Sequence, residues 1–400
     1  MTSWFNSKHL DIKNIININD LHGYVLPHAG TSFTGNIISH TLRFRPTNPI
    51  KKVIILYYPA NITPDIDNTY FHEYYVPWKS MDTIFNDKQI TYEGYNIANN
   101  EDIKIIKNLN LTSNIISNTI IVVSADFSHF LPFQTAIDLE NKAAHSLMFK
   151  EELYKNVVDD MKTFKILYDT IPNHWILQWV GRDRSIGEKA VGYLSFLLRE
   201  MTYPKNDIKK PDGMFVTAFS KNMVARECLG EWFDKKSSKQ SWNTTIENNL
   251  INRVIKLGET TSRLTNGLNL EKPLIHYTIT YLYKDTKRPF IRGWHGILHN
   301  AFYLPDVFLE NTFNNGTWIN KNHTTWQKGS VFKLNDTIKQ LNLKAGVIRG
   351  GKRKKRKTQY KGLYNDKQKQ KRKFTHKFYG GQLKENNIIL YSSRVAYYTL

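Results

Sequence analysis

Two short apolar runs constrain the fold of this chain more than any other feature. Residues 53–58 read Val-Ile-Ile-Leu-Tyr-Tyr, and residues 119–125 read Thr-Ile-Ile-Val-Val-Ser-Ala. Largely apolar runs of this length, rich in β-branched residues, are typical of strands that are buried on both faces of a parallel sheet. Helical patterns at 135–149, 150–163 and 186–201 follow the second run. This order predicts a layered α/β domain in the first half of the chain.

Polar residues follow the predicted strands where a site would form. His28 lies in a Pro-His-Ala-Gly turn after an apolar lead-in, and Asp126 and His129 follow the run at 119–125. Because the carboxyl ends of parallel strands meet at one edge of a sheet, these three side chains are expected to converge. Two imidazoles and a carboxylate suit Zn, Fe or Cu, or acid-base work in a cleft. Gly30 allows close approach to a ligand; the alternative is that His28 is a structural histidine.

A second candidate site precedes the predicted helix at 186–201. The segment Val-Gly-Arg-Asp-Arg-Ser-Ile-Gly at 180–187 places Arg182 near a helix start, where free backbone N–H groups can hold an anion. The other interpretation is a solvated glycine turn in which Ser185 is the N-cap.

The second half of the chain mixes strand and helix patterns. A polar stretch with a proline near each end, residues 204–213, is typical of a linker. Beyond it, the patterns predict strands at 214–219, 274–283 and 387–398, a helix at 242–257 and a short helix at 335–341. This mixed order indicates an α+β second domain.

Cysteine content and hydropathy limit the compartment. Cys228 is the only cysteine, so no intrachain disulfide can form, which fits a reducing environment. No secretory signal is visible at the start, and no apolar window reaches the length of a membrane span. We therefore expect an intracellular protein, cytoplasmic or nuclear. Cys228 has no base beside it in the sequence, which favours a small buried hydrophobe over a nucleophile.

The basic character of the chain is concentrated in one segment. The net charge is +21, and residues 349–377 carry fourteen lysines and arginines against one acid, Asp366. Six consecutive basic residues form the centre of this segment: Lys352, Arg353, Lys354, Lys355, Arg356 and Lys357. Such a run can be an unordered basic insertion, a nuclear-localisation patch or a grip on nucleic-acid phosphates.

The first half resembles the Memo family. The turn at 27–30, with Phe33 and Gly35 after it, is similar to that family's Pro-His-Ala-Gly-Tyr…Tyr-x-Gly signature. The Ser-Ala-Asp-Phe-Ser-His-Phe segment at 124–130 resembles its Ser-Ser-Asp-Phe-x-His-Trp motif, and 181–187 resembles its Gly-Arg-x-Pro-Ile-Gly segment. These motifs span about residues 20–200 in the family's order.

The resemblance implies a fold and a metal pocket. Memo proteins share the α/β sandwich of class III extradiol dioxygenases, so His28 would occupy a metal-ligand position and Asp126 and His129 would line the same pocket. The family's second ligand, a histidine after the next strand, is absent, and only Asn61 stands near that place. Neither the family's Glu-x-x-His stretch nor its cysteine ligand has a counterpart here. His72 is the residue that could replace a missing ligand, if it points into the pocket.

The second half resembles the AMMECR family. Arg226, Glu227, Cys228 and Gly230 belong to an Ala-Arg-Glu-Cys-Leu-Gly segment that is similar to that family's Leu-Arg-Gly-Cys-Ile-Gly hexapeptide. The Trp-His-Gly-Ile and Tyr-Leu-Pro-Asp-Val segments further on also resemble its motifs. Because Memo-like and AMMECR-like domains occur fused, sometimes beside a radical-SAM protein, the resemblance implies a partner of that kind and a shared modification pathway.

Together these observations predict an α/β sandwich at 1–203, a linker at 204–212 and an α+β domain at 213–400 that carries a basic insertion at 347–385.

Three functions follow from this architecture. The missing ligands favour a partner-binding scaffold with a vestigial metal pocket, which would use the AMMECR-like surface around residues 226–230. The second is a metal-dependent redox or dioxygenase-like enzyme, with Fe, Cu or Zn at His28 and Asp126, and with Asp126 and His129 as acid-base groups. Its substrate would be a small molecule or a protein. The third is nucleic-acid attachment through the basic segment.

Overall fold

The computed structural model describes most of the chain. The described residues are 4–59, 72–109, 118–153, 157–159, 161–187, 190–201, 210–233, 242–260, 273–285, 289–299, 301–311 and 389–400. Asn61, most of the predicted linker, the predicted helix at 335–341 and the whole basic insertion lie outside these residues.

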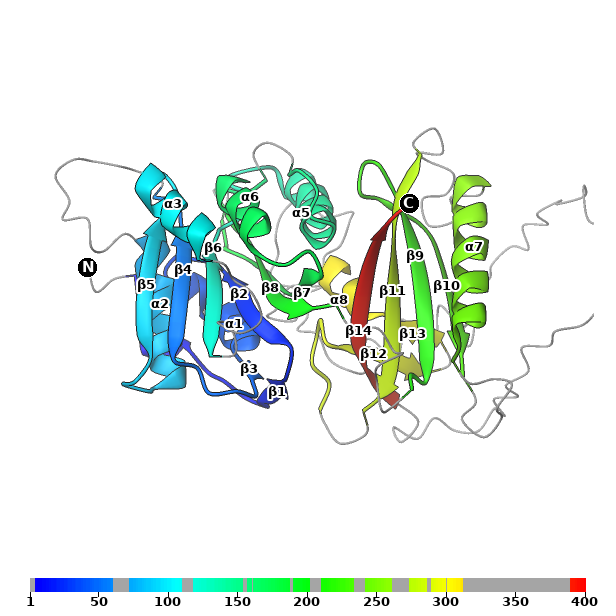
Figure 1. The fold of residues 1–400 in the computed structure, drawn as a ribbon, viewed down its shortest axis with the longest axis horizontal. Helices are drawn as coiled ribbons and strands as arrows, with labels where there is room; N and C mark the ends of the chain where they lie inside the picture. The colour runs from blue at the N-terminus through cyan, green and yellow to red at the C-terminus, as the bar shows by residue number, and fades with distance from the viewer. Residues whose placement is uncertain are drawn as a thin grey trace, which may run out of the picture.

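A six-stranded sheet forms the first half of the molecule (Figure 1). Its strand order is β5-β4-β6-β2-β8-β7; the first four strands are parallel, and β8 is antiparallel to both of its neighbours. The bounds of these strands are β2 Leu21–Leu26, β4 Lys52–Tyr57, β5 Thr91–Asn96, β6 Thr119–Ser124, β7 Trp175–Arg184 and β8 Gly192–Glu200. A small parallel pair, β1 Ile16–Ile18 and β3 Phe44–Pro46, lies beside it.

Helices cover both faces of this sheet, which explains the continuous burial of its central strands. One core includes residues of α1 Thr31–Thr41 and α2 His72–Phe85. The opposite core includes residues of α3 Asn100–Asn108, α5 Phe133–Met148 and α6 Met161–Thr170. A single 3-10 turn, η1 Ser7–His9, precedes α1 in the chain and packs on it. The first half is therefore a three-layer α/β structure, as predicted.

Two of the predicted helices are wrong. Most of the segment 186–201 is strand β8, Gly192–Glu200, although its apolar residues have helical spacing. Since β8 is buried on both faces, its run from Tyr193 to Leu198 does not alternate between apolar and polar residues, and a helical period is contained in it by chance. The helix expected at 150–163 begins only at Met161.

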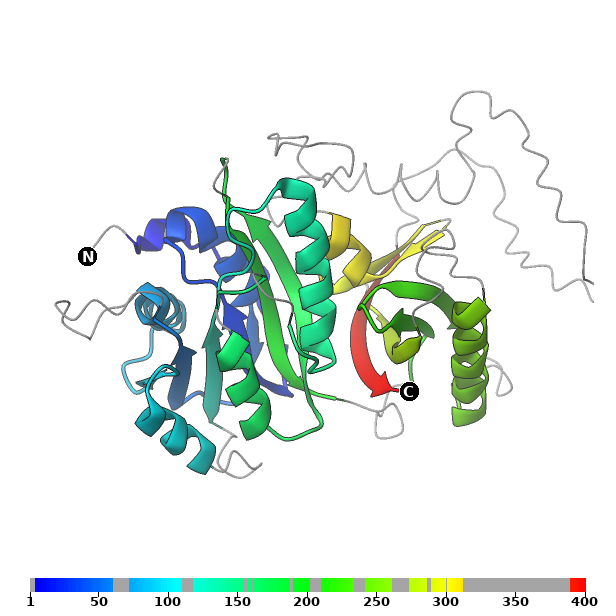
Figure 2. The same ribbon diagram turned by 90° about the horizontal axis from the view of Figure 1, so that it is seen from above.

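The second half is built on an antiparallel sheet that curls into half a barrel (Figure 2). Its order is β10-β9-β11-β14-β12-β13. The bounds are β9 Gly213–Ser220, β10 Ala225–Trp232, β11 Leu274–Lys284, β12 His295–His299, β13 Ala301–Tyr303 and β14 Ile389–Thr399. The helix α7 Thr244–Thr260 packs its Leu250 and Val254 on this sheet, and the short helix α8 Pro305–Asn311 lies between the two halves (Figure 1).

The two halves share buried contacts. Leu309 of α8 and Tyr397 of β14 belong to one hydrophobic core of the first half, and Trp294 belongs to the other. Gly293 has a positive φ of 70°, and a Cβ there would lie 2.3 Å from the carbonyl oxygen of Val180. This close approach of two backbones requires glycine. Within the described part of the chain, no helix has the length and apolarity to cross a membrane.

Candidate metal centre

The parallel strands β2 and β6 bring His28 and Asp126 together. Leu26 lies beside Ser124 in the ladder, so the residues that follow both strands leave the sheet at the same edge. The backbone N–H of His28 donates to Asp126 Oδ1 at 2.9 Å. Both side chains are buried. The predicted convergence of these two residues is confirmed, while their chemical roles stay predictions.

The ring of His28 is held at both nitrogens. Its Nδ1 lies 3.0 Å from Ser124 Oγ, and that hydroxyl donates to the carbonyl oxygen of Glu73. Because the hydroxyl hydrogen is used by Glu73, Ser124 Oγ accepts from His28 Nδ1–H. This bond directs Nε2 to the pocket, where it lies 3.0 Å from Asp159 Oδ2 and 3.8 Å from Asp126 Oδ2.

Burial and charge act in opposite directions on these groups. Burial by itself would lower the pKa of His28, but the carboxylates of Asp126 and Asp159 outweigh it and raise the pKa to about 9. The pKa of Asp126 is raised, mainly because its carboxylate is buried; the positive charge of His28 opposes that shift and Asp159 adds to it. Without another cation, the pocket therefore favours a protonated His28.

Asp159 is a pocket residue that the sequence did not indicate. It lies next to the β-bridge between Phe127 and Val158. Its Oδ2 accepts from the backbone N–H of Asp126 at 3.2 Å, and its own N–H donates to the carbonyl oxygen of Asp126 at 3.1 Å. The sequence around it suggested a helix, and only the tertiary pairing brings it to the sheet edge.

His72 and Glu73 complete the cluster from the first turn of α2. Suitable ligand atoms of His28, His72 and Glu73 lie within 4.8 Å of one another, so the group could hold a metal ion. His72 Nε2 lies 3.2 Å from Glu73 Oε1, and the rings of His28 and His72 are 5.2 Å apart. Glu73 is 1% exposed. The sequence singled out His72 as a replacement ligand but missed Glu73, whose only signal is its position directly after that histidine.

The pKa of His72 moves in the direction that metal binding needs. Burial lowers it, the carboxylate of Glu73 opposes that shift, and the charge of His28 adds to it. A neutral imidazole is the form that binds a metal.

His129 lies beside the cluster and is not a member of it. It pairs with Val191 in an isolated β-bridge and is half-buried. Its charge lowers the pKa of Asp126 slightly, as the last of several causes. His129 is therefore only a neighbour of the pocket.

Gly30, predicted to approach a ligand, approaches another part of the chain instead. It precedes α1, and a Cβ there would lie 3.3 Å from the carbonyl oxygen of Trp4.

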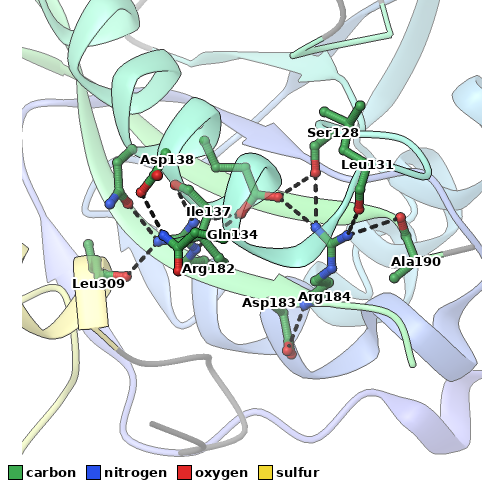
Figure 3. Close-up of polar contacts among 12 residues, drawn as sticks. Ser128, Leu131, Gln134, Ile137, Asp138, Arg182, Asp183, Arg184, Ala190 and Leu309 are labelled. Atoms are coloured by element: carbon green, nitrogen blue, oxygen red, sulfur yellow. Dashed lines mark hydrogen bonds and ion pairs between the residues drawn. The ribbon is translucent and has the colours of Figure 1, made fainter. Parts of the chain in front are cut away.

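Arg182 is a buried residue of β7, which differs from the helix-start position that the sequence suggested. Its guanidinium is fully buried and pairs with Glu140 of α5 at 2.7 Å. It also donates to Asn141 Oδ1 at 2.6 Å. Figure 3 shows its further hydrogen bonds to the carbonyl oxygens of Ile137 and Leu309. These protein acceptors occupy the donors that an anion would need.

The same network reaches the loop that carries Asp126. Arg184 pairs with Glu140 Oε1 at 3.1 Å and donates to Ser128 Oγ at 3.1 Å, as Figure 3 shows for the arginine and the serine. Ser128 Oγ donates to Glu140 Oε1 at 2.5 Å. Glu140 therefore connects β7 to the loop after β6.

The AMMECR-like segment lies in β10, where two of its members are buried and do not form the surface that was predicted. Arg226 is 1% exposed and donates to the carbonyl oxygen of Gly258 in α7 at 2.6 Å. Glu227 is buried as well and accepts from the N–H of Cys228. Cys228 is half-buried, and Thr217 Oγ1 lies 3.2 Å from its sulfur. A Cβ at Gly230 would meet the ring of Phe215 at 2.3 Å. The packing of α7 on the sheet accounts for this burial.

Comparison with known proteins finds neither a protein-family model nor a curated protein that matches the chain.

Proposed function

We propose that the chain is a divergent Memo–AMMECR fusion and a metal-dependent enzyme, whose pocket binds one divalent ion through His28, His72 and Glu73. The observation that carries this proposal is the convergence of these three side chains at the carboxyl edge of the sheet. His72 supplies the second histidine ligand that the strand end after β4 lacks. The missing ligands alone favour a vestigial pocket, but with His72 and Glu73 beside His28 we favour a working metal site.

The donor set fits a transition metal. Two imidazoles and a carboxylate are ligands that zinc and non-haem iron use in proteins. Bonds of about 2.1 Å place neighbouring ligand atoms roughly 3–3.5 Å apart, and His72 Nε2 and Glu73 Oε1 are 3.2 Å apart. The hydrogen bond from His28 Nδ1 to Ser124 orients the other ring nitrogen, as the hydrogen bonds behind metal-bound histidines commonly do.

Asp126 is the group that we assign to proton transfer. Its carboxylate lies beside His28, and burial raises its pKa, which favours a carboxyl that can hold and return a proton. A divalent ion would supply a Lewis acid or a redox centre at the same pocket. The reaction class that these groups support is a metal-dependent redox or dioxygenase-like conversion of a small molecule or a protein group.

A partner-binding scaffold is the second candidate, and one contact favours it. His28 Nε2 already has an ion-pair partner in Asp159 Oδ2 at 3.0 Å, so the imidazole is satisfied without any metal. In that case the pocket would be a buried charge cluster that stabilises the sheet edge.

Metal titration separates the two candidates. Wild-type protein is titrated with Zn²⁺, Cu²⁺ and, without oxygen, Fe²⁺, beside His28→Ala, His72→Ala and the control His129→Ala. We expect one equivalent to bind tightly, with losses of at least about 100-fold in the first two variants and little change in the control. Weak binding that neither His28→Ala nor His72→Ala alters would support the scaffold instead.

A further inference from the structure

Trp4 covers one proposed metal ligand directly. Its ring stacks on the ring of His72 with centroids 4.7 Å apart and an angle of 14° between the planes. His72 is the first residue of α2. Glu73 contacts the Nε2 edge of His72, and Trp4 covers a face of the ring. The two contacts together fix the orientation of the imidazole.

The position of Trp4 is set by a different helix. The N–H of Thr31, the first residue of α1, donates to the carbonyl oxygen of Trp4 at 2.8 Å. Asn6 N–H donates to Thr31 Oγ1 at 2.8 Å, and that hydroxyl lies 3.2 Å from the carbonyl oxygen of Asn6. The tight fit at Gly30 keeps this crossing close. Residues 4–6 therefore form a strap from the start of α1 to the start of α2.

The strap spans the two elements that carry the proposed ligands. The helix α1 follows the loop of His28, and α2 begins with His72 and Glu73. Trp4 is 45% exposed, so this indole is anchored through its backbone and its ring face while its outer side meets solvent. A large aromatic residue held in this way shields the ring on which it stacks without being part of the core.

We infer that Trp4 is a positioning residue for the divalent metal: it stacks on His72 and holds that imidazole in its ligand orientation, so that loss of the indole speeds release of the ion. This inference rests on the proposed function. A stacked ring pair is strong enough to change the population of one side-chain orientation up to about tenfold. The expected signature is therefore a change in the rate of metal release, with the fold unchanged.

The test compares Trp4→Ala and Trp4→Phe with wild type, using Zn²⁺ alone. Release into excess chelator should be about tenfold faster in Trp4→Ala and near the wild-type rate in Trp4→Phe, which keeps a ring. Phe33→Ala is the matched control, because Phe33 lies in the first turn of α1 and is 55% exposed. It should release Zn²⁺ at the wild-type rate, and circular dichroism should show the same secondary structure for all variants.

A second measurement needs no metal. Diethylpyrocarbonate modification of His72, followed by peptide mass spectrometry, should be faster in metal-free Trp4→Ala than in wild type or Phe33→Ala. Equal release and equal modification in Trp4→Ala and wild type would overturn the role of Trp4 and leave the metal site standing. Failure of the wild-type protein to bind Zn²⁺, Cu²⁺ or Fe²⁺ would overturn the proposed function and this inference together.

Discussion

Asp183 shows how one buried carboxylate makes stability depend on pH. It lies in β7 with 4% exposure, where the N–H of Arg184 donates to it and Arg292 is the charge that faces it from the second half. Burial raises the pKa of Asp183 to about 7, although both neighbours lower it. An unfolded aspartate titrates near pH 4. The folded state therefore binds an extra proton between about pH 4 and 7, and stability falls as the pH rises through that window.

Substitution of this residue should remove that dependence. We expect Asp183→Asn to flatten the change in unfolding free energy between about pH 4 and 7, which can reach about 4 kcal/mol for a shift of this size. Urea unfolding at several pH values measures it. Asp138→Asn is the control, because Asp138 is exposed on α5 and should keep the wild-type slope. Equal slopes for both variants would show that Asp183 does not titrate in this range.

The candidate site could be predicted from the sequence only at strand ends. Asp126 follows a run with a clear strand signal and His28 follows an apolar lead-in, so their meeting at one sheet edge can be deduced from the sequence. His72 and Glu73 come from a helix in an aromatic-rich stretch whose order was not readable, and Pro77 interrupts its pattern. Asp159 reaches the pocket through backbone contacts with Asp126, which no local pattern records.

At the scale of elements, the same limit explains β8. The strands β4 and β6 are short and bounded by turn residues, so their buried runs were assigned correctly. The run in β8 is longer and equally buried, and a buried strand and a buried helix have the same apolar composition. Its antiparallel pairing with β2, which is distant in the sequence, and with β7 decides between strand and helix. Local spacing could not provide that information.

Glu140 is the residue through which α5, β7 and the loop after β6 depend on one another. It is fully buried and pairs with Arg182 and Arg184. Glu140→Gln would leave two buried guanidinium groups without their counter-charge, which typically costs about 3–5 kcal/mol. Denaturant unfolding measures this loss.

A surface pair provides the control for that substitution. Glu101 and Lys104 of α3 lie 2.8 Å apart, with both side chains largely exposed. Glu101→Gln should change stability little, because solvent screens exposed ion pairs. A loss in Glu140→Gln no greater than that in Glu101→Gln would mean that the buried network does not stabilise the fold.

At the scale of the whole molecule, the two sheets are joined by buried contacts. Arg182 donates to Leu309 at the carboxyl end of α8, and His145 of α5 binds the carbonyl oxygen of Met223 and pairs with Glu310. Arg182 also pairs with Glu140, which pairs with Arg184 and accepts from Ser128 Oγ in the loop of Asp126. The second half is therefore linked to that loop through these two ion pairs. The antiparallel sheet is thus packed against the elements that hold the candidate metal centre.

The basic run from Lys352 to Lys357 lies outside the described residues, so its role remains a prediction from charge. If the run grips nucleic acid, deletion of residues 350–375, or glutamine at all six positions, should weaken binding to a single-stranded oligonucleotide. The slope of log K against log salt should become shallower by about 0.7 for each phosphate that the protein no longer neutralises. Fluorescence anisotropy across salt concentrations measures both effects, and the thermal unfolding midpoint should not change.

A charge-matched variant makes this experiment specific. The charge-matched control changes six exposed lysines of the first half to glutamine, which removes the same formal charge as the six-glutamine variant of the run but at scattered positions: Lys13, Lys51, Lys104, Lys107, Lys162 and Lys165. If the clustered run binds the strand, this control should keep most of the affinity and of the salt slope, because charges at separate positions do not contact one strand together. Equal losses of affinity in the two six-glutamine variants would instead show that the net charge of +21, and not the clustered run, accounts for the binding. Unchanged binding in the deletion would exclude the run as a nucleic-acid contact and leave a nuclear-localisation patch or an inert basic insertion as the interpretations.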